Sequence, residues 1–249
     1  MSFGWSRWLG VLLAIFPLVG SAEGFDWSLY RELLAKHVDE SYAEGIHYAG
    51  VDYRAWAKDP RHQKQKELLD LFDVTDLKSD KQKLAFYINA YNFLAIDLII
   101  QHPDVESIRD IGSWWKPVWG LEYGSIGGQS ISLGHIEHDI LRQLKEPRIH
   151  FAIVCASLSC PDLRKEPYSA ENLDFELEEQ ALAFISNSSK GVRATAEKIQ
   201  VSKIFDWFEE DFVERGGVIK FISRYKSSLS DGVSDFYYLK YNWSVNHQK

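Results

Sequence analysis

The chain has 249 residues with 28 basic and 36 acidic side chains, and a formal net charge of −8 at pH 7. This acidic balance excludes nucleic acid and anionic membrane as the main partner, because both carry negative charge. Hydrophobic residues make up 45% of the chain and no repeat, low-complexity run or Pro-rich linker interrupts it, which favours one domain with a sizeable core.

The first 22 residues predict the compartment. Arg7 precedes an apolar stretch of about a dozen residues, which is followed by small residues ending at Ala22. This pattern is typical of a secretory signal peptide, and the stretch is too short for a comfortable membrane span. We therefore expect residues 1–22 to be removed and residues 23–249 to form a periplasmic or secreted domain with no stable membrane insertion. Disulfides persist in such a compartment.

Helices dominate the elements predicted for the first half. The strongest is 80–101, where apolar residues cover every side of the helix from Leu84 onward, as expected of a helix buried in the middle of a domain. Further helices are expected over 26–37, 52–58 and 63–72, and a hairpin is expected within 121–133.

The second half mixes helices and strands. Ser132 is expected to cap a helix through Leu144, and the apolar run 149–155 reads as a central strand. The remaining expected elements are a helix over 169–187, a hairpin over 192–202, helices over 203–213 and 217–226, and a terminal strand over 236–246. Because the alternation is irregular, we predict an α+β fold in a single domain: a central mixed or antiparallel sheet, a buried central helix and surrounding helices.

Two cysteines, Cys155 and Cys160, follow the expected central strand. A helix and a strand joined by a short turn lie antiparallel, so the end of the strand should lie beside the start of helix 132–144. A thiolate is favoured at that positive end of the helix dipole. His138 should point toward the cysteines, whereas Glu137 lies on the apolar face, where a carboxylate needs a partner.

This grouping predicts activated-thiol chemistry, in a hydrolase or acyl-transferase. In this hypothesis Cys155 is the nucleophile, His138 is the general base, and Glu137 or Asn89 orients the imidazole. Backbone amides near Ser157–Cys160 would form the oxyanion site. The expected substrate-binding residues are Asn92, Arg142, Ser157, Cys160 and Trp115. The ligand class stays open between a small molecule, a peptide and a glycan.

Structural interpretations compete with each of these roles. Asn89 and Asn92 are buried amides that could simply brace the fold. Glu137 could pair with Arg142, and His150 reads as a core histidine. A Cys155–Cys160 disulfide would make the pair a clip or a thiol–disulfide site, although the Cys-x4-Cys spacing is wider than the usual redox motif.

The segment "SWWKPVWG" supports a different class of function, a non-catalytic glycan- or protein-binding domain. Its Trp114, Trp115 and Trp119 could stack on a sugar ring or wall a cleft, or else close the core under a long loop. No metal or other cofactor is expected, because His135 and His138 have no second cluster at ligand spacing.

Six segments of the chain resemble the family known as domain of unknown function 547, found in bacteria and plants. They are "GVDYRAW" (50–56), "AFYINAYNFLAI" (85–96), "SLGHIEHDILR" (132–142), "RIHFAIVCASLSCPDL" (148–163), "SKIFDWFEEDF" (202–212) and "YLKYNWSVN" (238–246). The resemblance implies a small exported bacterial α+β domain with no established reaction, and it singles out Asn89, Asn92, Glu137, His138, Arg142 and Cys155.

Two positions qualify that resemblance. In plant-type members the position matching Cys160 is often Ser, which implies that a disulfide is not the common purpose of the family and favours Cys155 as nucleophile. Gly134 and His135 stand where the family has an acidic pair, so a role for those acids does not carry over to this chain.

Overall fold

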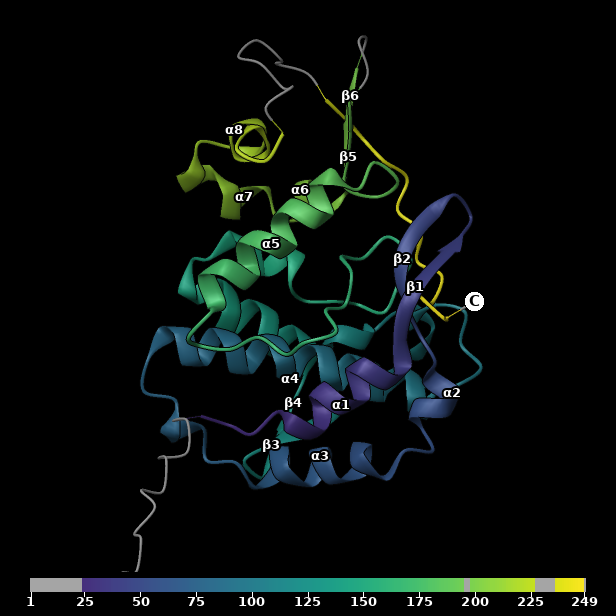
Figure 1. Cartoon of the computed structure of the whole chain (residues 1–249), viewed down its shortest axis with the longest axis vertical. Helices are drawn as coiled ribbons and strands as arrows, with labels where there is room; N and C mark the ends of the chain where they lie inside the picture. The colour runs from purple at the N-terminus through teal and green to yellow at the C-terminus, as the bar shows by residue number, and fades with distance from the viewer. Residues whose placement is uncertain (1–23, 195–197, 227–235, 249) are drawn as a thin grey trace, which may run out of the picture.

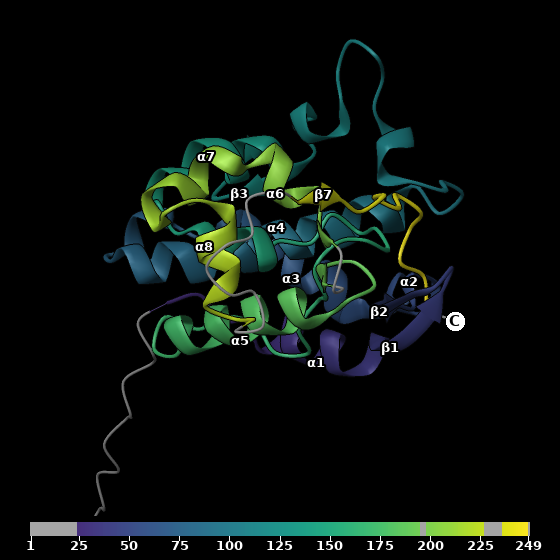
Figure 2. The ribbon, with the colours of Figure 1, turned by 90° about the horizontal axis from the view of Figure 1, so that it is seen from above.

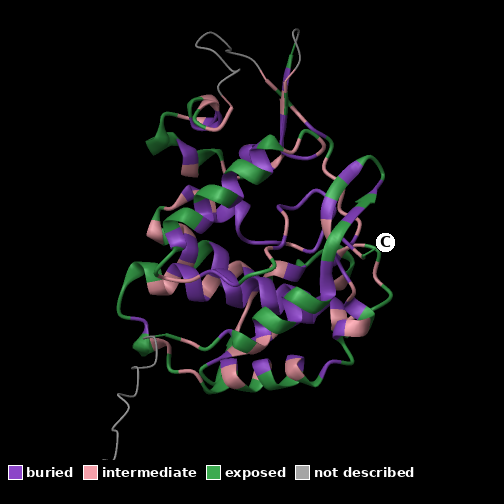
Figure 3. Cartoon of the chain, in the orientation of Figure 1, coloured by how far each residue is buried: buried purple, intermediate pink, exposed green. Residues whose placement is uncertain are grey.

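Helix α4 (Asp80–Gln101) lies at the centre of the computed structural model, which describes residues 24–194, 198–226 and 236–248. The Ser79 hydroxyl accepts the Gln82 N–H, and the Gln82 side chain accepts the Ser79 N–H, so a reciprocal cap fixes the start of the helix. Its side chains beyond the first turn are nearly all buried (Figure 3). Although α4 is long and apolar enough to span a membrane, 89% of its most apolar 18-residue stretch is buried inside the protein. The buried central helix is confirmed.

Three further helices precede α4 in the chain, at the positions that the sequence predicts. They are α1 (Ser28–His37), α2 (Tyr53–Trp56) and α3 (Pro60–Leu71) (Figure 1). The predicted signal peptide, residues 1–22, lies outside the described residues. A hairpin of β1 (Val38–Ala43) and β2 (Ile46–Val51) was not predicted. Its two-residue turn, Glu44–Gly45, has positive φ at both positions, which is the geometry that closes a tight hairpin.

Within the described residues, the strands form three small sheets and no single central sheet. Besides β1 and β2, antiparallel pairs form between β3 (Gly124–Ile126) and β4 (Gln129–Ile131) and between β5 (Val192–Ala194) and β6 (Ile199–Val201). Strand β7 (Tyr237–Tyr238) joins β6 in parallel. Both predicted hairpins are present, and the α+β class is confirmed with small sheets.

A second hydrophobic core lies beneath the C-terminal helices, which are α5 (Leu173–Ser186), α6 (Ile204–Trp207), α7 (Glu209–Phe212) and α8 (Val218–Ser223). Its centre is Phe151, which stacks on Phe184 and Phe221. The neighbouring residues Ala152, Ile153 and Val154 belong instead to the larger core around α4. The segment that leads into Cys155 therefore joins the two cores.

That segment is buried as predicted, but it is not a strand. After Pro147 the chain forms a 3₁₀ helix, Pro147–Phe151, begun by Glu146, whose carboxylate accepts the Arg148 N–H. The following residues form no strand, and the Asn92 side chain takes their backbone bonds: it donates to the Ala152 carbonyl and accepts the Val154 N–H. One buried amide thus does the work expected of a neighbouring strand.

The expected helix 132–144 is also different in kind. It is a π-helix, His135–Leu141, continued by a 3₁₀ turn, Arg142–Leu144, and ended by Lys145 in the left-handed region (φ 54°). Irregular helices of this type occur frequently at functional sites.

The expected terminal strand over 236–246 is regular only at β7. Beyond it, the chain runs as an extended connector that forms isolated bridges from Ser244 to Ser107, from Val245 to Ser157 and from His247 to Val51. The C-terminal segment therefore ties the cysteine loop to the N-terminal half of the molecule.

The segment between α4 and β3 projects from the body of the protein (Figure 2). Trp114 and Trp115 lie within it and are 88% and 90% exposed. These two rings do not close the core.

Candidate functional site

A cavity of about 150 Å³ opens between the π-helix, the cysteine loop, α6 and the C-terminal segment. Six aromatic side chains line it: Tyr91, Trp119, Trp207, Phe208, Tyr241 and Trp243. Side chains that can exchange protons or react through sulfur also line it: Glu137, His138, His150, Cys155 and Cys160. The structure thus brings together both cysteines, the predicted histidine and the predicted carboxyl group, in a largely apolar setting where polar interactions are strong.

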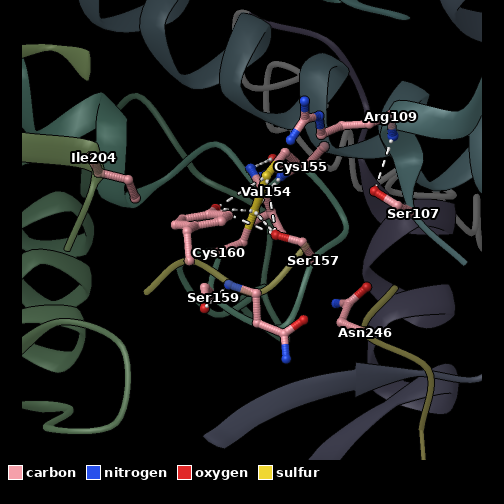
Figure 4. The surroundings of a disulfide bond; sticks show 12 residues. Ser107, Arg109, Val154, Cys155, Ser157, Ser159, Cys160, Ile204 and Asn246 are labelled. Atoms are coloured by element: carbon pink, nitrogen blue, oxygen red, sulfur yellow. Dashed lines mark hydrogen bonds between the residues drawn. A yellow bond between two sulfur atoms is a disulfide. The ribbon is translucent and has the colours of Figure 1, made fainter. Parts of the chain in front are cut away.

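Cys155 and Cys160 are joined as a disulfide (Figure 4). The two sulfurs differ in access: Cys155 is partly exposed at the cavity, whereas Cys160 is 1% exposed. A thiolate entering the cavity would therefore meet the Cys155 sulfur first. In this state Cys155 carries no free thiol, so the oxidised chain does not present the predicted nucleophile.

Hydrogen-bond donors surround the buried sulfur. Cys160 Sγ accepts from the Cys155 backbone N–H at 3.0 Å, from the Ser157 hydroxyl at 3.2 Å and from the Tyr241 hydroxyl at 3.3 Å. The same two hydroxyls lie farther from Cys155 Sγ, at 3.5 and 3.4 Å. Because each hydroxyl has one proton, the shorter contacts favour Cys160 as the acceptor. The loop is thus built to stabilise negative charge on Cys160.

Backbone bonds hold the loop that carries these donors. Leu158 N–H donates to the Ser244 carbonyl, Ser159 N–H to Asn242, and Cys160 N–H to Ser157. These amides are the ones expected to form an oxyanion site. Since all three are already engaged, they are not free to bind a substrate oxyanion in this arrangement.

Glu137 is buried at the cavity, where the Tyr91 hydroxyl donates to its Oε2 at 3.3 Å. Burial raises the pKa of this carboxyl to about 7, against the smaller opposing effects of Tyr91 and Arg142. The predicted Glu137–Arg142 ion pair is not formed, because Arg142 binds Asp211 instead. Glu137 can therefore hold or release a proton near neutral pH.

His138 lies at the cavity but does not have the hydrogen bonds of a general base. Its Nδ1 lies 3.3 Å from the Arg142 guanidinium. Since a guanidinium only donates, Nδ1 is the acceptor and the proton of the neutral ring is on Nε2. Burial, and then the Arg142 charge, lower the pKa of His138. Glu137 makes no hydrogen bond to this imidazole in the described part of the chain.

A second histidine, His150, has the better-organised partners. Its Nε2 lies 2.6 Å from Asp211 Oδ2, and Arg142 holds the same carboxylate through two bonds, at 2.7 and 2.8 Å. The imidazole stacks on Phe208 with centroids 4.0 Å apart. The sequence predicts a core position for His150 and gives no prediction for Asp211. The available signal was that a buried histidine needs a partner.

The remaining predicted residues have separate roles. The side-chain amide of Asn89 donates to the Tyr168 carbonyl and accepts the Tyr168 N–H, at 2.8 Å each, so this side chain braces the fold and does not orient an imidazole at the cavity. Asn92 positions the segment before Cys155. Trp115 is exposed outside the cavity, and Trp119 takes the lining position. No group of three or more potential metal ligands occurs among residues 24–194, 198–226 and 236–248.

No curated protein and no solved structure matches the chain significantly. Residues 74–185, which include α4, the π-helix and both cysteines, match the family model described as "Protein of unknown function, DUF547". The match spans 112 of the 249 residues, and this part of the chain is similar to the DUF547 family.

Proposed function

We propose that the chain is an exported thiol–disulfide exchange protein, in which the Cys155–Cys160 bridge reacts with thiols that enter the aromatic cavity. The observation that carries the proposal is the asymmetry of the bridge. Both cysteines line the cavity, but Cys155 is partly exposed, whereas Cys160 is 1% exposed and its sulfur receives three hydrogen bonds. The predicted signal peptide fits this function, since an oxidised pair persists outside the cytosol.

The asymmetry assigns a role to each sulfur. A substrate thiolate attacks Cys155 Sγ, the S–S bond breaks, and Cys160 leaves as a thiolate. Exchange is faster when the leaving thiolate is stabilised, and the donors around Cys160 act on that atom. Spacing alone counts against a redox pair, but reactivity depends on access and on the leaving group, and both are favourable here.

The wall of the cavity indicates the kind of thiol. Trp207 and Trp243 stack with centroids 5.4 Å apart, and Tyr241 packs against both rings. An apolar or aromatic group beside the substrate sulfur would bury surface against these rings. We therefore favour small apolar thiols, or cysteines next to apolar residues in peptides, over strongly charged thiols.

Equilibration in glutathione redox buffers tests this function. The bridge of the native protein is expected to open reversibly at a potential above about −300 mV, the usual limit of structural disulfides. Alkylation after acid quenching, with mass spectrometry, gives the fraction reduced. A bridge that stays closed until the protein unfolds would assign it a purely structural role.

The cysteine-hydrolase hypothesis is a second candidate, favoured by Glu137 and His138 lining the same cavity as Cys155. It applies only to the reduced chain. Cys160→Ser cannot form the bridge and keeps Cys155 free, so hydrolysis of activated esters and amides by this variant would support the hydrolase. Exchange chemistry instead predicts no turnover of these substrates.

A further inference from the structure

One ring nitrogen of His150 has no hydrogen-bond partner in the described structure, and the proposed exchange gives it no role so far. Its ring is 2% exposed and lines the cavity, and its Nδ1 is buried with no hydrogen-bond partner in the described structure. The Nε2 atom lies 2.6 Å from the Asp211 carboxylate, which can only accept, so Nε2 carries the proton. Nδ1 is therefore an unprotonated acceptor in need of a donor from a ligand or water.

We propose that His150, held by Asp211, is the general base that takes the proton of the incoming substrate thiol. This inference rests on the proposed exchange function and adds a catalytic pair to it. The residue type and geometry fit, because a histidine oriented by a carboxylate can accept a proton on its free nitrogen while the carboxylate stabilises the resulting imidazolium.

The neighbouring groups are less suited to the task. His138 uses its Nδ1 to accept from Arg142 and is exposed. Glu137 accepts from Tyr91. The groups that act electrostatically on His150 are Asp211 from α7, and Arg142 and His138 from the irregular helix. Burial, Arg142 and His138 lower the pKa of His150 and Asp211 opposes them, so the neutral, proton-accepting form prevails at neutral pH.

Arg142 and Phe208 act as positioning residues. Arg142 fixes the Asp211 carboxylate through two bonds, and Phe208 stacks on the His150 ring. These contacts restrict rotation of the imidazole, and Nδ1 is its nitrogen without a partner in the described structure. Preorganisation of this kind is what a proton acceptor in a buried site requires.

The reaction begins with proton transfer and ends with a reduced protein. The substrate R–SH gives its proton to His150 Nδ1, and R–S⁻ attacks Cys155 Sγ. The S–S electron pair moves to Cys160, which receives the proton and becomes a thiol. A second substrate thiol then attacks the substrate sulfur of the mixed disulfide and releases R–S–S–R and the Cys155 thiol. A disulfide-bearing electron acceptor recloses the bridge.

The test compares two thiols of similar size and different acidity in single-turnover reduction of the oxidised protein, followed by acid quench and mass spectrometry. Mercaptoethanol is mostly protonated at neutral pH, whereas trifluoroethanethiol ionises much more readily. His150→Gln is expected to slow the mercaptoethanol reaction by about 100-fold. It should slow the trifluoroethanethiol reaction far less, because that thiol arrives already ionised. His135→Gln, at an exposed position, is the matched control.

The pH profile gives an independent readout without a variant. With a base, the mercaptoethanol rate of the wild-type chain should be level between the lowered pKa of His150 and the higher pKa of the thiol. Without a base, it should rise about tenfold per pH unit in that interval, following the thiolate fraction. Asp211→Asn serves as a second variant and should show the same selective slowing as His150→Gln.

The outcomes are separable. If His150→Gln slows both thiols equally, or slows neither, or if the wild-type profile rises tenfold per unit, the base assignment is overturned while exchange stands. If the folded wild-type bridge reacts no faster than an unstructured peptide spanning residues 153–162, exchange itself fails.

Discussion

Buried histidines bond carboxylates at several places in the described structure, and the difference between His62 and His150 separates structure from function. His62 Nε2 lies 2.8 Å from Asp97, and its Nδ1 accepts the indole N–H of Trp56 at 3.0 Å. Both ring nitrogens are satisfied within the core around α4. His150 has the same bond to Asp211 but leaves Nδ1 unpartnered at a cavity. A completed pair fixes the fold, whereas an incomplete pair beside an opening can act on a ligand.

The largest effect should come from breaking the completed pair. Asp97→Asn is expected to destabilise the protein by about 3–5 kcal/mol, because it removes the buried carboxylate that pairs with Lys66 and bonds His62. Asp211→Asn should cost less, about 1–2 kcal/mol, since that carboxylate is partly exposed. Urea unfolding measures both. Equal losses would remove the distinction drawn between the two pairs.

Glu137 differs from both Asp97 and Asp211, because it is a buried carboxyl without a bonded cation. Its folded-state pKa of about 7 lies above the unfolded value of 4.5, so the folded state binds the extra proton. The contribution of Glu137 to stability should be fully present below pH 4.5 and should be lost, by up to about 3 kcal/mol, as the pH rises through 7.

Glu137→Gln should remove most of this dependence, as measured by urea unfolding across the same pH interval. Glu171→Gln, at an exposed position, is the control and should leave the dependence in place. A Glu137→Gln profile as steep as the wild type would show that another group is responsible.

Asn89 and Asn92 offer a matched pair one turn apart on α4. Each alanine variant removes two hydrogen bonds to buried backbone, which should cost about 2–3 kcal/mol in each case. Asn92 alone holds the segment that enters Cys155, so only Asn92→Ala should also change the exchange rate. If both variants change that rate alike, the effect comes from general loosening of α4.

The smallest effect is expected at the exposed tryptophans. Trp115→Ala should change stability by less than about 0.5 kcal/mol and leave thiol exchange unchanged, because the ring touches neither core nor cavity. A glycan array compared between wild type and variant tests the binding-module alternative at this surface. Loss of a wild-type glycan signal in the variant would give the projecting segment a function of its own.

Local patterns in the sequence predict the helices well. The all-round apolar surface and the capping pair Ser79–Gln82 are both properties of a short segment, and α4 follows them closely. The hairpins with Gly-containing turns also follow from local turn chemistry, as with Gly127–Gly128 between β3 and β4. The β1–β2 hairpin was missed because its only local turn signal is Glu44–Gly45.

Partners distant in sequence could not be predicted in the same way. The segment after Phe151 has the composition of a buried strand, yet its hydrogen-bond partner is the Asn92 side chain, about 60 residues earlier. The cavity does combine Cys155, His138 and Glu137. Asp211 was not anticipated, because only the packing of α7 against the irregular helix brings it to His150 and Arg142.

The most direct test of the central claim is the reaction of two serine variants with oxidised glutathione under native conditions. Cys160→Ser leaves the more exposed sulfur and should form a stable mixed disulfide on Cys155. Cys155→Ser leaves only the buried sulfur and should form little or none. Equal labelling of the two variants, or labelling confined to Cys160, would contradict the assignment of Cys155 as the attacked sulfur and Cys160 as the leaving group.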